Sequence, residues 1–456
     1  MARAAAMSGF PELLPGQRFV EQHLVEQLVR TFELHGFSPV ETRAVEPLET
    51  LLSKGETSKE VYVLRRLQAD PDRPAADAGM GLHFDLTVPF ARYVQEFAGK
   101  LEFPFRRYQI QKVWRGERPQ EGRYREFTQA DIDIVGRDEL AFHHDVEVAR
   151  VMAEALAALP VPRVRLQVNN RRLIQGFYAG LGVLDVDAVM RVVDKLDKVG
   201  PDAVAELLVR DAGLDERQAG LCLRLAAIRS ADTSFVEQVR ALGVTSDLLD
   251  QGLAELAAVL TGCASAVGER VAVEADLRIA RGLDYYTGTV FETVMEGLEH
   301  LGSICSGGRY DALAGDGRTT YPGVGISLGL SRMLVPLLAS GRLAASRSVP
   351  SAVLVALVDE DARPAADEAA QQLRSRGIPA EVAAAPQRFG KQIRYAERRG
   401  IPFVWFAGDP GGPDQVKDIR SGDQVAADLA SWTPPAEDLR PQVVSAPHPD
   451  SKEQHP

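Results

Sequence analysis

Residues 125–134 carry charged and amide side chains in a pattern that a hydrophobic core does not need. Read as a strand, this segment directs alternate side chains to opposite faces. Burying a carboxylate or an amide without partners would cost roughly several kcal/mol. We therefore predict that the polar face lines a pocket for a polar ligand. That face carries Arg125, Phe127, Gln129, Asp131 and Asp133, whereas the opposite face carries Thr128, Ala130, Ile132 and Ile134.

A second strand is predicted over residues 105–115, joined to the first by a loop rich in Gly, Pro and Arg, as in a long hairpin. Arg115 stands at the mouth of this loop, and Arg118 and Arg123 flank its turn. The planar, permanently charged guanidinium group suits phosphate binding. The alternative is a solvated charged hairpin, because exposed charges are common and contribute little. The one-faced polar strand and the long loop favour a phosphate pocket.

The hairpin and four further peptides resemble a known family. The hairpin resembles motif 2 of class II aminoacyl-tRNA synthetases, with Val-Trp-Arg-Gly-Glu at 113–117 in place of the phenylalanine form. Arg-Gly-Leu-Asp-Tyr-Tyr-Thr at 281–287 and Gly-Gly-Arg-Tyr-Asp at 307–311 resemble the two peptides that mark histidyl-tRNA synthetases. Residues 323–332 resemble motif 3, and residues 85–89 resemble the amino-acid loop. Each peptide is weak alone, but their shared order makes coincidence a poor explanation.

The resemblance implies a multidomain α+β and α/β protein. A class II catalytic domain built on an antiparallel sheet is expected in residues 1–338, interrupted by a helical insertion at about 174–268. A small α/β anticodon-binding domain is expected at 350–433, and a disordered tail at 434–456. The family's activity would be activation of L-histidine with ATP and Mg²⁺, followed by transfer to the 3′ end of tRNA-His. The resemblance also implies a homodimer in the cytoplasm.

Amino-acid activation joins a carboxylate to the α-phosphorus of ATP while pyrophosphate leaves, so cations must stand where negative charge develops. Arg115 and Arg281 are the candidates at the α-phosphate and the expected catalytic residues. Arg332 and Arg123 would lie toward the β- and γ-phosphates. Phe127 offers its ring to adenine by stacking, with Glu117 on the adenine side. The expected ATP-binding residues are Arg115, Glu117, Arg123, Phe127 and Arg332.

An imidazole is recognised by partners for both ring nitrogens, and a carboxylate with a phenol suits it better than apolar walls. Asp133 with Tyr286 or Tyr310 could supply them. Asp85 and Asp133 stand where many family members have glutamate, and Ser331 replaces the usual motif 3 glutamate. The family's α-ammonium positions match Asp85, Thr87 and Gln129. The expected histidine-binding residues are Asp85, Thr87, Arg115, Gln129, Asp133, Arg281, Tyr285, Tyr286 and Tyr310.

A catalytically silent paralogue is the alternative function, because such paralogues activate a phosphoribosyltransferase of histidine biosynthesis. They usually lose the phosphate arginines and the basic C-terminal domain. Arg115, Arg281 and Arg332 are all present here, and so is the C-terminal block. The sequence therefore favours the synthetase.

Composition limits the other possibilities. The 456 residues carry a formal charge of −12, which argues against a generally basic nucleic-acid coat and against DNA as a partner. Cys222, Cys263 and Cys305 form no CxxC pair, so neither a disulfide framework nor a cysteine metal site is expected, and no metal ligand is assigned. The first residues are too weakly apolar for a signal peptide, and no run approaches the ~20 apolar residues of a membrane span. These features fit a reducing cytosol without membrane attachment.

Periodicity predicts an amphipathic helix over about 17–35, which in the family belongs to the dimer interface, although a plain core helix fits equally well. Strands are expected at 163–168, near 271 and at 289–294, followed by a glycine-rich turn at 306–310. After a linker at about 339–350, strands and helices alternate to 407, which indicates a small parallel or mixed sheet with flanking helices.

A basic segment lies in this last block. Between residues 386 and 400, five basic residues stand against one acid, in a chain that is acidic as a whole. Such a patch is where a polyanion would dock, although a solvated basic helix is the alternative. The expected tRNA-binding residues are Arg388, Lys391, Arg394 and Arg398.

Overall fold

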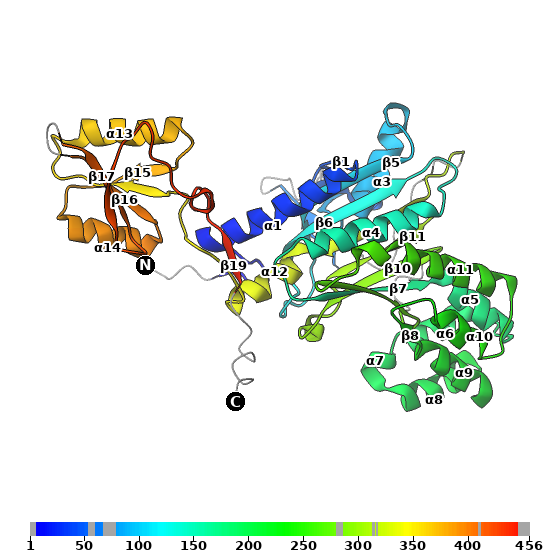
Figure 1. The fold of residues 1–456 in the computed structure, drawn as a ribbon. Helices are drawn as coiled ribbons and strands as arrows, with labels where there is room; N and C mark the ends of the chain where they lie inside the picture. Colours follow the sequence, from blue (N-terminus) through cyan, green and yellow to red (C-terminus); the bar gives the residue numbers. More distant parts are fainter. Residues whose placement is uncertain are drawn as a thin grey trace, which may run out of the picture. The chain divides into compact units, whose positions relative to one another are not determined.

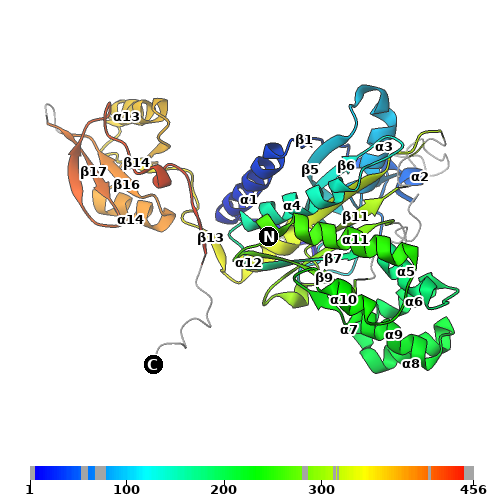
Figure 2. The same cartoon turned by 45° about the vertical axis from the view of Figure 1, so that its right-hand side comes forward.

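The computed structural model describes residues 6–52, 60–66, 79–279, 286–311, 315, 318–408 and 412–445, with Asp197 described by its backbone only. These residues form two compact units (Figures 1 and 2). One unit lies within residues 1–11 and 25–336, and the other within residues 12–24 and 337–456.

A nine-stranded sheet forms the centre of the larger unit, in the order β1-β5-β6-β12-β11-β10-β7-β9-β8. Its neighbours are antiparallel except for β1 with β5 and β7 with β9, which are parallel. The strands are β1 Ser38–Pro39, β5 Phe105–Trp114, β6 Glu126–Val135, β7 Val164–Asn170, β8 Arg229–Ser230, β9 Val271–Asp276, β10 Thr289–Met295, β11 Cys305–Tyr310 and β12 Gly323–Gly329.

The two faces of this sheet differ as the alternation in β6 predicts. Ala130, Ile132 and Ile134 are fully buried, and α4 (His143–Ala157) packs against β6 and β12. We call this helix-covered side the back face. The opposite side, which carries Gln129, Asp131 and Asp133, is called the front face. α11 (Asp247–Gly262) covers β7 and β9, and α12 (Leu330–Ala339) follows β12.

Two smaller elements lie beside the front face. β2 (Val45–Pro47), β4 (Met80–Leu82) and β3 (Val63–Leu64) form a three-stranded sheet with α2 (Leu48–Leu51) beside it. α3 (Thr87–Phe97) buries Phe90 and Val94 against Val135 and Tyr321. This apolar cluster closes one end of the front face, so the polar residues lie between it and the hairpin loop.

Helices occupy most of residues 171–262. Several of them begin with a side-chain cap: the Asn170 side chain accepts from two backbone amides of α5, and Asp215 forms a capping box with Gln218 at α9. Ser246 caps α11 in the same way. The helices are α5 Arg171–Gly180, α6 Val186–Val193, α7 Leu196–Val199, α8 Pro201–Ala212, α9 Glu216–Ala226, α10 Phe235–Arg240 and α11.

The smaller unit contains a five-stranded sheet in the order β15-β14-β16-β17-β18. β14 (Val353–Val355) runs parallel to β15 (Ala380–Val382) and β16 (Phe403–Phe406), and α13 (Arg363–Ser375) and α14 (Phe389–Arg399) connect them. β17 (Asp414–Asp418) and β18 (Gln424–Ala427) extend the sheet as an antiparallel hairpin. The sequence did not predict this hairpin, because β18 is largely exposed and neither strand has an apolar run.

The prediction of a turn at 306–310 is wrong, because this glycine-rich segment belongs to strand β11. A Cβ on Gly307 would lie 2.1 Å from the Gly325 carbonyl oxygen, and one on Gly308 would lie 2.6 Å from the Thr289 carbonyl oxygen. The glycines therefore permit close strand packing, which local composition does not distinguish from a turn.

The expectation of a disordered tail from 434 is wrong for residues 434–445. A short 3₁₀ turn spans Ala436–Asp438, and β19 (Val443–Ser445) pairs with β13 (Leu343–Ala345), which lies in the predicted linker. Arg420 forms an ion pair with Asp438 at 2.8 Å, and Arg347 donates to its backbone carbonyl. These partners are about 20 to 100 residues away, so proline content alone could not reveal them. Residues 446–456 lie outside the described residues.

Candidate active site

The hairpin β5–β6 places polar residues opposite one another on the front face. Arg107 pairs in register with Asp133, Gln109 with Asp131, and Gln111 with Gln129. The loop between the strands is closed by a hydrogen bond from the Arg115 backbone amide to the Arg125 carbonyl oxygen at 2.9 Å. The long hairpin expected from the sequence is therefore present, with its polar side chains gathered on one face.

All five expected ATP-binding residues and Gln129 line one pocket at the loop end of the front face. The Glu117 carboxylate lies between two cations, 3.7 Å from Arg115 Nη1 and 3.5 Å from Arg123 Nη1. The pocket is therefore rich in guanidinium groups held near one carboxylate. The remaining lining comprises Gly122, Tyr124, Ser303, Ile304, Ser306, Ser327 and Gly329, which we did not single out as site residues from the sequence.

Two pocket arginines also hold the surrounding loops. Arg332, on α12, donates from Nε to the Gly122 carbonyl oxygen at 2.9 Å and from Nη1 to the Ser303 carbonyl oxygen at 2.6 Å. Arg115 donates from Nε to the Phe84 carbonyl oxygen at 3.0 Å, and its Cζ lies 5.1 Å from the centre of the Phe127 ring. These contacts set the position of both guanidinium groups without a bound ligand.

A second polar cluster, formed by Asp133, Tyr286 and Tyr310, lies farther along the front face and packs over two glycines. Gly325 and Gly308 are paired in register beside Asp133. A Cβ on Gly325 would lie 2.1 Å from Asp133 Oδ1, and one on Gly308 would lie 2.7 Å from the Tyr286 ring. The Tyr310 hydroxyl donates to Asp133 Oδ1 at 2.8 Å. The structure thus brings together Asp133, Tyr286 and Tyr310, as expected for imidazole recognition.

Arg107 is a residue of this site that the sequence reasoning missed. Its side chain is fully buried, its Nη2 lies 2.6 Å from Asp133 Oδ2, and its Cζ lies 4.2 Å from the centre of the Phe90 ring. The alternation in β5 put Arg107 on the polar face, but its partner depends on the strand register. An alignment of the two predicted strands, residue by residue, could have revealed that Arg107 lies opposite Asp133.

Asp131 lies between Gln129 and Asp133 on β6. Its burial raises its pKa to about 7; nearby Arg107 opposes that rise, and Asp133 adds to it. Ser327 connects the row, because its hydroxyl accepts from Gln129 Nε2 and hydrogen-bonds to Asp131. This carboxylate therefore titrates near neutral pH instead of near the usual value for aspartate.

The segment before α3 approaches the pocket from the side. Asp85 Oδ1 accepts a hydrogen bond from the Val88 backbone amide at 3.0 Å, and Thr87 is the first residue of α3. One Asp85 oxygen therefore helps to begin the helix, and the contact of Arg115 with Phe84 brings this segment to the site. Arg281 and Tyr285 lie outside the described residues, so their expected roles stay predictions.

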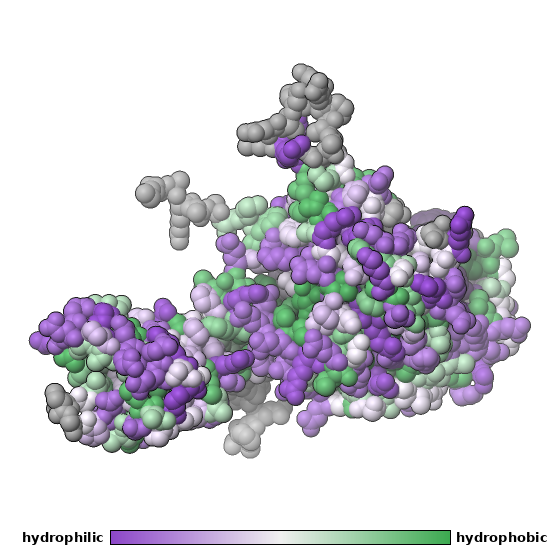
Figure 3. Space-filling model, turned by 90° about the horizontal axis from the view of Figure 1, so that it is seen from above, coloured by the Kyte–Doolittle hydropathy of each residue, from purple (hydrophilic) through white to green (hydrophobic). Residues whose placement is uncertain are grey.

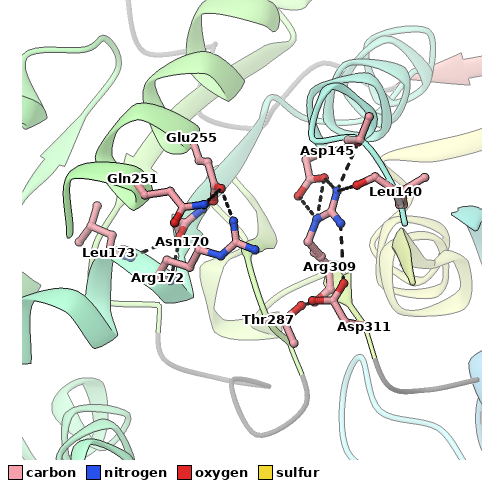
Figure 4. A network of polar contacts seen from close by, with 11 residues as sticks. Leu140, Asp145, Asn170, Arg172, Leu173, Gln251, Glu255, Thr287, Arg309 and Asp311 are labelled. Carbon is pink, nitrogen blue, oxygen red and sulfur yellow. Dashed lines mark hydrogen bonds and ion pairs between the residues drawn. The ribbon is translucent and has the colours of Figure 1, made fainter. Parts of the chain in front are cut away.

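A buried ion pair fixes β11 against α4 from the back face (Figure 4). Arg309 Nη2 lies 2.7 Å from Asp145 Oδ2, and the same nitrogen donates to the Leu140 carbonyl oxygen. Because side chains alternate along a strand, this contact points Gly308 and Tyr310 toward the front face. Arg309 therefore orients the strand that carries Tyr310 of the second polar cluster.

The basic segment of the smaller unit borders its own groove. Lys391, Arg394 and Arg398 line the groove with Tyr395, whereas the exposed Arg388 stands at the start of α14. Gln392 holds the helix in place, since its side chain bonds both the amide and the carbonyl of Leu357. The expected tRNA-binding residues are therefore exposed on one helix and its N-terminal cap.

Carboxylates near the pocket offer little for a metal ion. Glu117, which lines the pocket, is already engaged by two arginines. Among the described residues, His143, His144 and Glu147 on α4 bring three ligand atoms within 4.8 Å, but Arg106 holds the Glu147 carboxylate at 3.1 Å. Mg²⁺ prefers oxygen ligands and usually binds through substrate phosphates with one or two carboxylates. The site thus fits a magnesium ion carried mainly by ATP.

The described helices include none long and apolar enough to cross a membrane. Hydrophilic and apolar residues are interspersed over the face seen in Figure 3.

A large sheet with a helix-covered back and an arginine-rich polar front, together with a separate small α/β unit, is the architecture of a class II aminoacyl-tRNA synthetase. The histidyl-tRNA synthetase family model matches residues 9–333, and an anticodon-binding domain model matches residues 352–430. The chain belongs to the histidyl-tRNA synthetase family.

Individual relatives agree with this membership. The chain is 59% identical to the histidine–tRNA ligase of Cutibacterium acnes, over 97% of this chain and 99% of that protein. It is also 59% identical to the histidine–tRNA ligase of Micrococcus luteus, over 98% and 100%. The histidyl-tRNA synthetase structure from Nostoc sp. PCC 7120 superposes with a TM-score of 0.82 at 34% identity, covering 94% of this chain and 98% of that chain.

A structure from Bacillus halodurans titled as an ATP phosphoribosyltransferase regulatory subunit/histidyl-tRNA synthetase also matches, with a TM-score of 0.70. At 20% identity, covering 86% of this chain and 96% of that chain, it shows the fold alone. The regulatory alternative is therefore not favoured over the synthetase.

Proposed function

We propose that this chain activates L-histidine with ATP to histidyl-adenylate and transfers the histidyl group to the 3′ end of tRNA-His. The observation that carries the proposal is the convergence of Arg115, Arg123 and Arg332 on one pocket, on the same face of the sheet as the polar cluster around Asp133. The proposed ligase activity agrees with the names of two relatives of this chain.

The pocket arginines would serve the activation step. When the histidine carboxylate attacks the α-phosphorus, negative charge grows on the phosphate oxygens while pyrophosphate departs. Arg115, fixed by its hydrogen bond to Phe84, would stabilise that charge, with Arg281 as its expected partner. Arg123 and Arg332 would hold the β- and γ-phosphates. Little proton transfer is required, so no general base is assigned.

Adenine would stack on Phe127, whose ring lines the same pocket. Glu117 would then lie on the adenine side while its carboxylate keeps Arg115 and Arg123 in place. Mg²⁺ would arrive with ATP and offset the charge of the phosphates; no protein ligand is assigned to it.

Histidine would bind beside the second polar cluster. Its α-ammonium group would meet Asp85, Thr87 and Gln129, and its imidazole would meet Asp133 with Tyr310 and Tyr286. A hydroxyl that donates to Asp133 can still accept from an imidazole N–H, so the pair offers acceptors at a fixed place. Gly325 and Gly308 let the side chains of Asp133 and Tyr286 pack directly over the strands, because a Cβ at either glycine would clash with them.

The anticodon arm of tRNA-His would bind the groove along α14. Arg388, Lys391, Arg394 and Arg398 would neutralise its phosphates, and the ring of Tyr395, which lines the groove, is placed to stack on a base. The exposed positions of the four cations support this role over a buried structural one.

Assembly and compartment are further parts of the proposal. We infer a homodimer, because β1 is an exposed edge strand and Leu34 at the end of α1 (Pro15–Leu34) is 77% exposed. We infer action in the cytoplasm, because Cys222, Cys263 and Cys305 are all buried free thiols. Light scattering of the purified chain tests the dimer.

Pyrophosphate exchange with a panel of amino acids tests the function. We expect exchange that depends on L-histidine and ATP, followed by charging of tRNA-His in the same preparation. Exchange stimulated by another amino acid, or none with histidine, would contradict the proposal.

A further inference from the structure

Three oxygen acceptors on the front face are buried without a donor among the described residues. They are Asp131 Oδ1, Gln129 Oε1 and Gln109 Oε1. Their residues are only 2%, 7% and 1% exposed, respectively. Gln109 and Asp131 pair in register, and Gln129 lies two residues before Asp131 on the same face. Buried polar atoms in native proteins are nearly always satisfied. The neighbouring Arg107 also has nitrogens without a hydrogen-bond partner in the described part of the chain, but its guanidinium group lies closer to Asp133 than to Asp131. The three acceptors therefore point to a further donor supplied by a ligand.

The charges around Asp131 also indicate a cationic ligand. Arg107 Nη2 lies 2.6 Å from Asp133 Oδ2 but 3.9 Å from Asp131 Oδ2. The Tyr310 hydroxyl donates to Asp133 as well. The negative charge of Asp133 is therefore well balanced, whereas that of Asp131 is balanced only in part. Asp85 adds a further negative charge beside Asp131, and the Cys305 thiol on β11 is the other titratable neighbour. Two carboxylates thus share the charge of Arg107, with Asp85 beside them.

We propose that Asp131 is a further substrate-binding residue, whose carboxylate pairs with the α-ammonium group of histidine. The amide oxygens of Gln129 and Gln109 accept the other two ammonium N–H groups. An ammonium group has three donors and no acceptor, which matches three oxygens. This inference rests on the proposed function and revises one part of it: Gln129 keeps its expected role, whereas Asp131 and Gln109 take the places of Asp85 and Thr87 as acceptors of the ammonium N–H groups.

The imidazole fits these oxygens less well. A neutral imidazole offers one donor and one acceptor, so it would leave two of the three oxygens unsatisfied. It has matched partners in the second polar cluster, where the Tyr310 hydroxyl donates to Asp133. The burial of Asp131 without a full counter-ion accounts for its pKa near 7, and an ammonium group would favour its ionised form.

Two ligands that differ in the ammonium group test the assignment on the full-length chain. Histamine carries both an ammonium group and an imidazole, whereas imidazolepropionate carries the imidazole without the ammonium group. Calorimetry at pH 8 should show that Asp131→Asn weakens histamine binding by roughly 30-fold or more, as for the loss of a buried charge-assisted hydrogen bond. Imidazolepropionate binding should change by less than about 3-fold. Gln109→Met should weaken histamine binding in the same direction by a smaller factor.

A matched control is Glu274→Gln, which neutralises a carboxylate of the same sheet on β9 that does not line the pocket. It should leave both ligands unaffected. Equal weakening of both ligands by Asp131→Asn, or unchanged histamine binding, overturns the inference. Histidine-dependent exchange by the wild-type chain is measured in parallel. If the wild-type chain catalyses exchange but Asp131→Asn binds histamine as tightly as the wild type, only this inference fails. If the wild-type chain shows no histidine-dependent exchange, the proposed function fails.

Discussion

Arg107 and Asp133 form an ion pair buried between β5 and β6, with Arg107 Nη2 2.6 Å from Asp133 Oδ2. The pair joins the two strands of the hairpin at the position where the imidazole of the substrate is expected. A guanidinium group with no exposed surface must keep a counter-ion, and the counter-ion here is also the proposed specificity residue. If Asp133 has the proposed role, stability and histidine recognition would depend on the same two side chains.

Arg107→Met should be strongly destabilising. Removing the guanidinium group leaves Asp131 and Asp133 buried beside each other without a cation, which costs about 3–5 kcal/mol when one partner of a buried pair is lost. Urea unfolding measures the change. The double variant Arg107→Met/Asp133→Asn should lose less than the sum of the single changes, and full additivity would argue that the two residues are not coupled.

Asp133→Asn should raise the KM for histidine by tens of fold, roughly, while the KM for ATP moves little. In the proposed complex the carboxylate would accept an N–H of the imidazole, whereas the amide could present that ring with an N–H donor. Arg107 keeps Asp131 as a neighbour in this variant, so the chain should still fold. Exchange kinetics with each substrate varied in turn give both constants. An unchanged KM for histidine in a folded variant would assign recognition to Tyr286 and Tyr310.

Arg115→Ala should lower the rate of pyrophosphate exchange by roughly two to three orders of magnitude, because a fixed cation at the developing charge is lost. Arg115→Lys should recover little, since an ammonium group cannot reproduce the fork that meets Phe84 and the phosphate. Arg125→Ala is the matched control: Arg125 belongs to the same loop region, bonds the Glu117 carbonyl oxygen and does not line the pocket. Equal loss in both alanine variants would mean a general effect of the loop.

Arg394→Glu combined with Arg398→Glu should weaken aminoacylation and flatten its dependence on salt, since fewer phosphate contacts release fewer counterions. Exchange without tRNA should stay near the wild-type rate, because both residues lie on α14 in the smaller unit. Arg399→Glu, on the same helix but not in the groove, should have a smaller effect. If exchange and aminoacylation fall together, the smaller unit supports the catalytic fold instead.

Asp131 should make the protein less stable as pH rises from about 4 to 7. Its pKa is about 7 in the folded chain and near its ordinary value when unfolded, so over this range the folded state holds the extra proton. Raising the pH removes that proton and the stability that goes with it. Urea unfolding at pH 5 and pH 8 should therefore show Asp131→Asn gaining stability over the wild type mainly at pH 8. An equal difference at both values would contradict the raised pKa.

The sequence by itself determined the chemistry and the local elements. Alternation in β6 separated Gln129 and Asp133 from Ile132, because side chains of a strand point to opposite faces whatever the strand pairs with. The arginines of the hairpin loop and motif 3 indicated a phosphate pocket from residue type and order. The strands and helices of the smaller unit followed from short apolar runs between polar segments, although β17 and β18 were too polar and exposed to be recognised.

The tertiary structure decided which of these residues meet. The register of β5 against β6 made Arg107 the partner of Asp133, and the pairing of β11 with β12 made an apparent glycine turn a strand of the central sheet. Pairing of β13 with β19 ordered a segment that its prolines marked as a tail. Each outcome depends on contacts between residues far apart in the chain, and the burial they create also sets the pKa of Asp131. Residue order and local periodicity contain no information about that burial, so the sequence identified Asp131 only as a polar residue of one face.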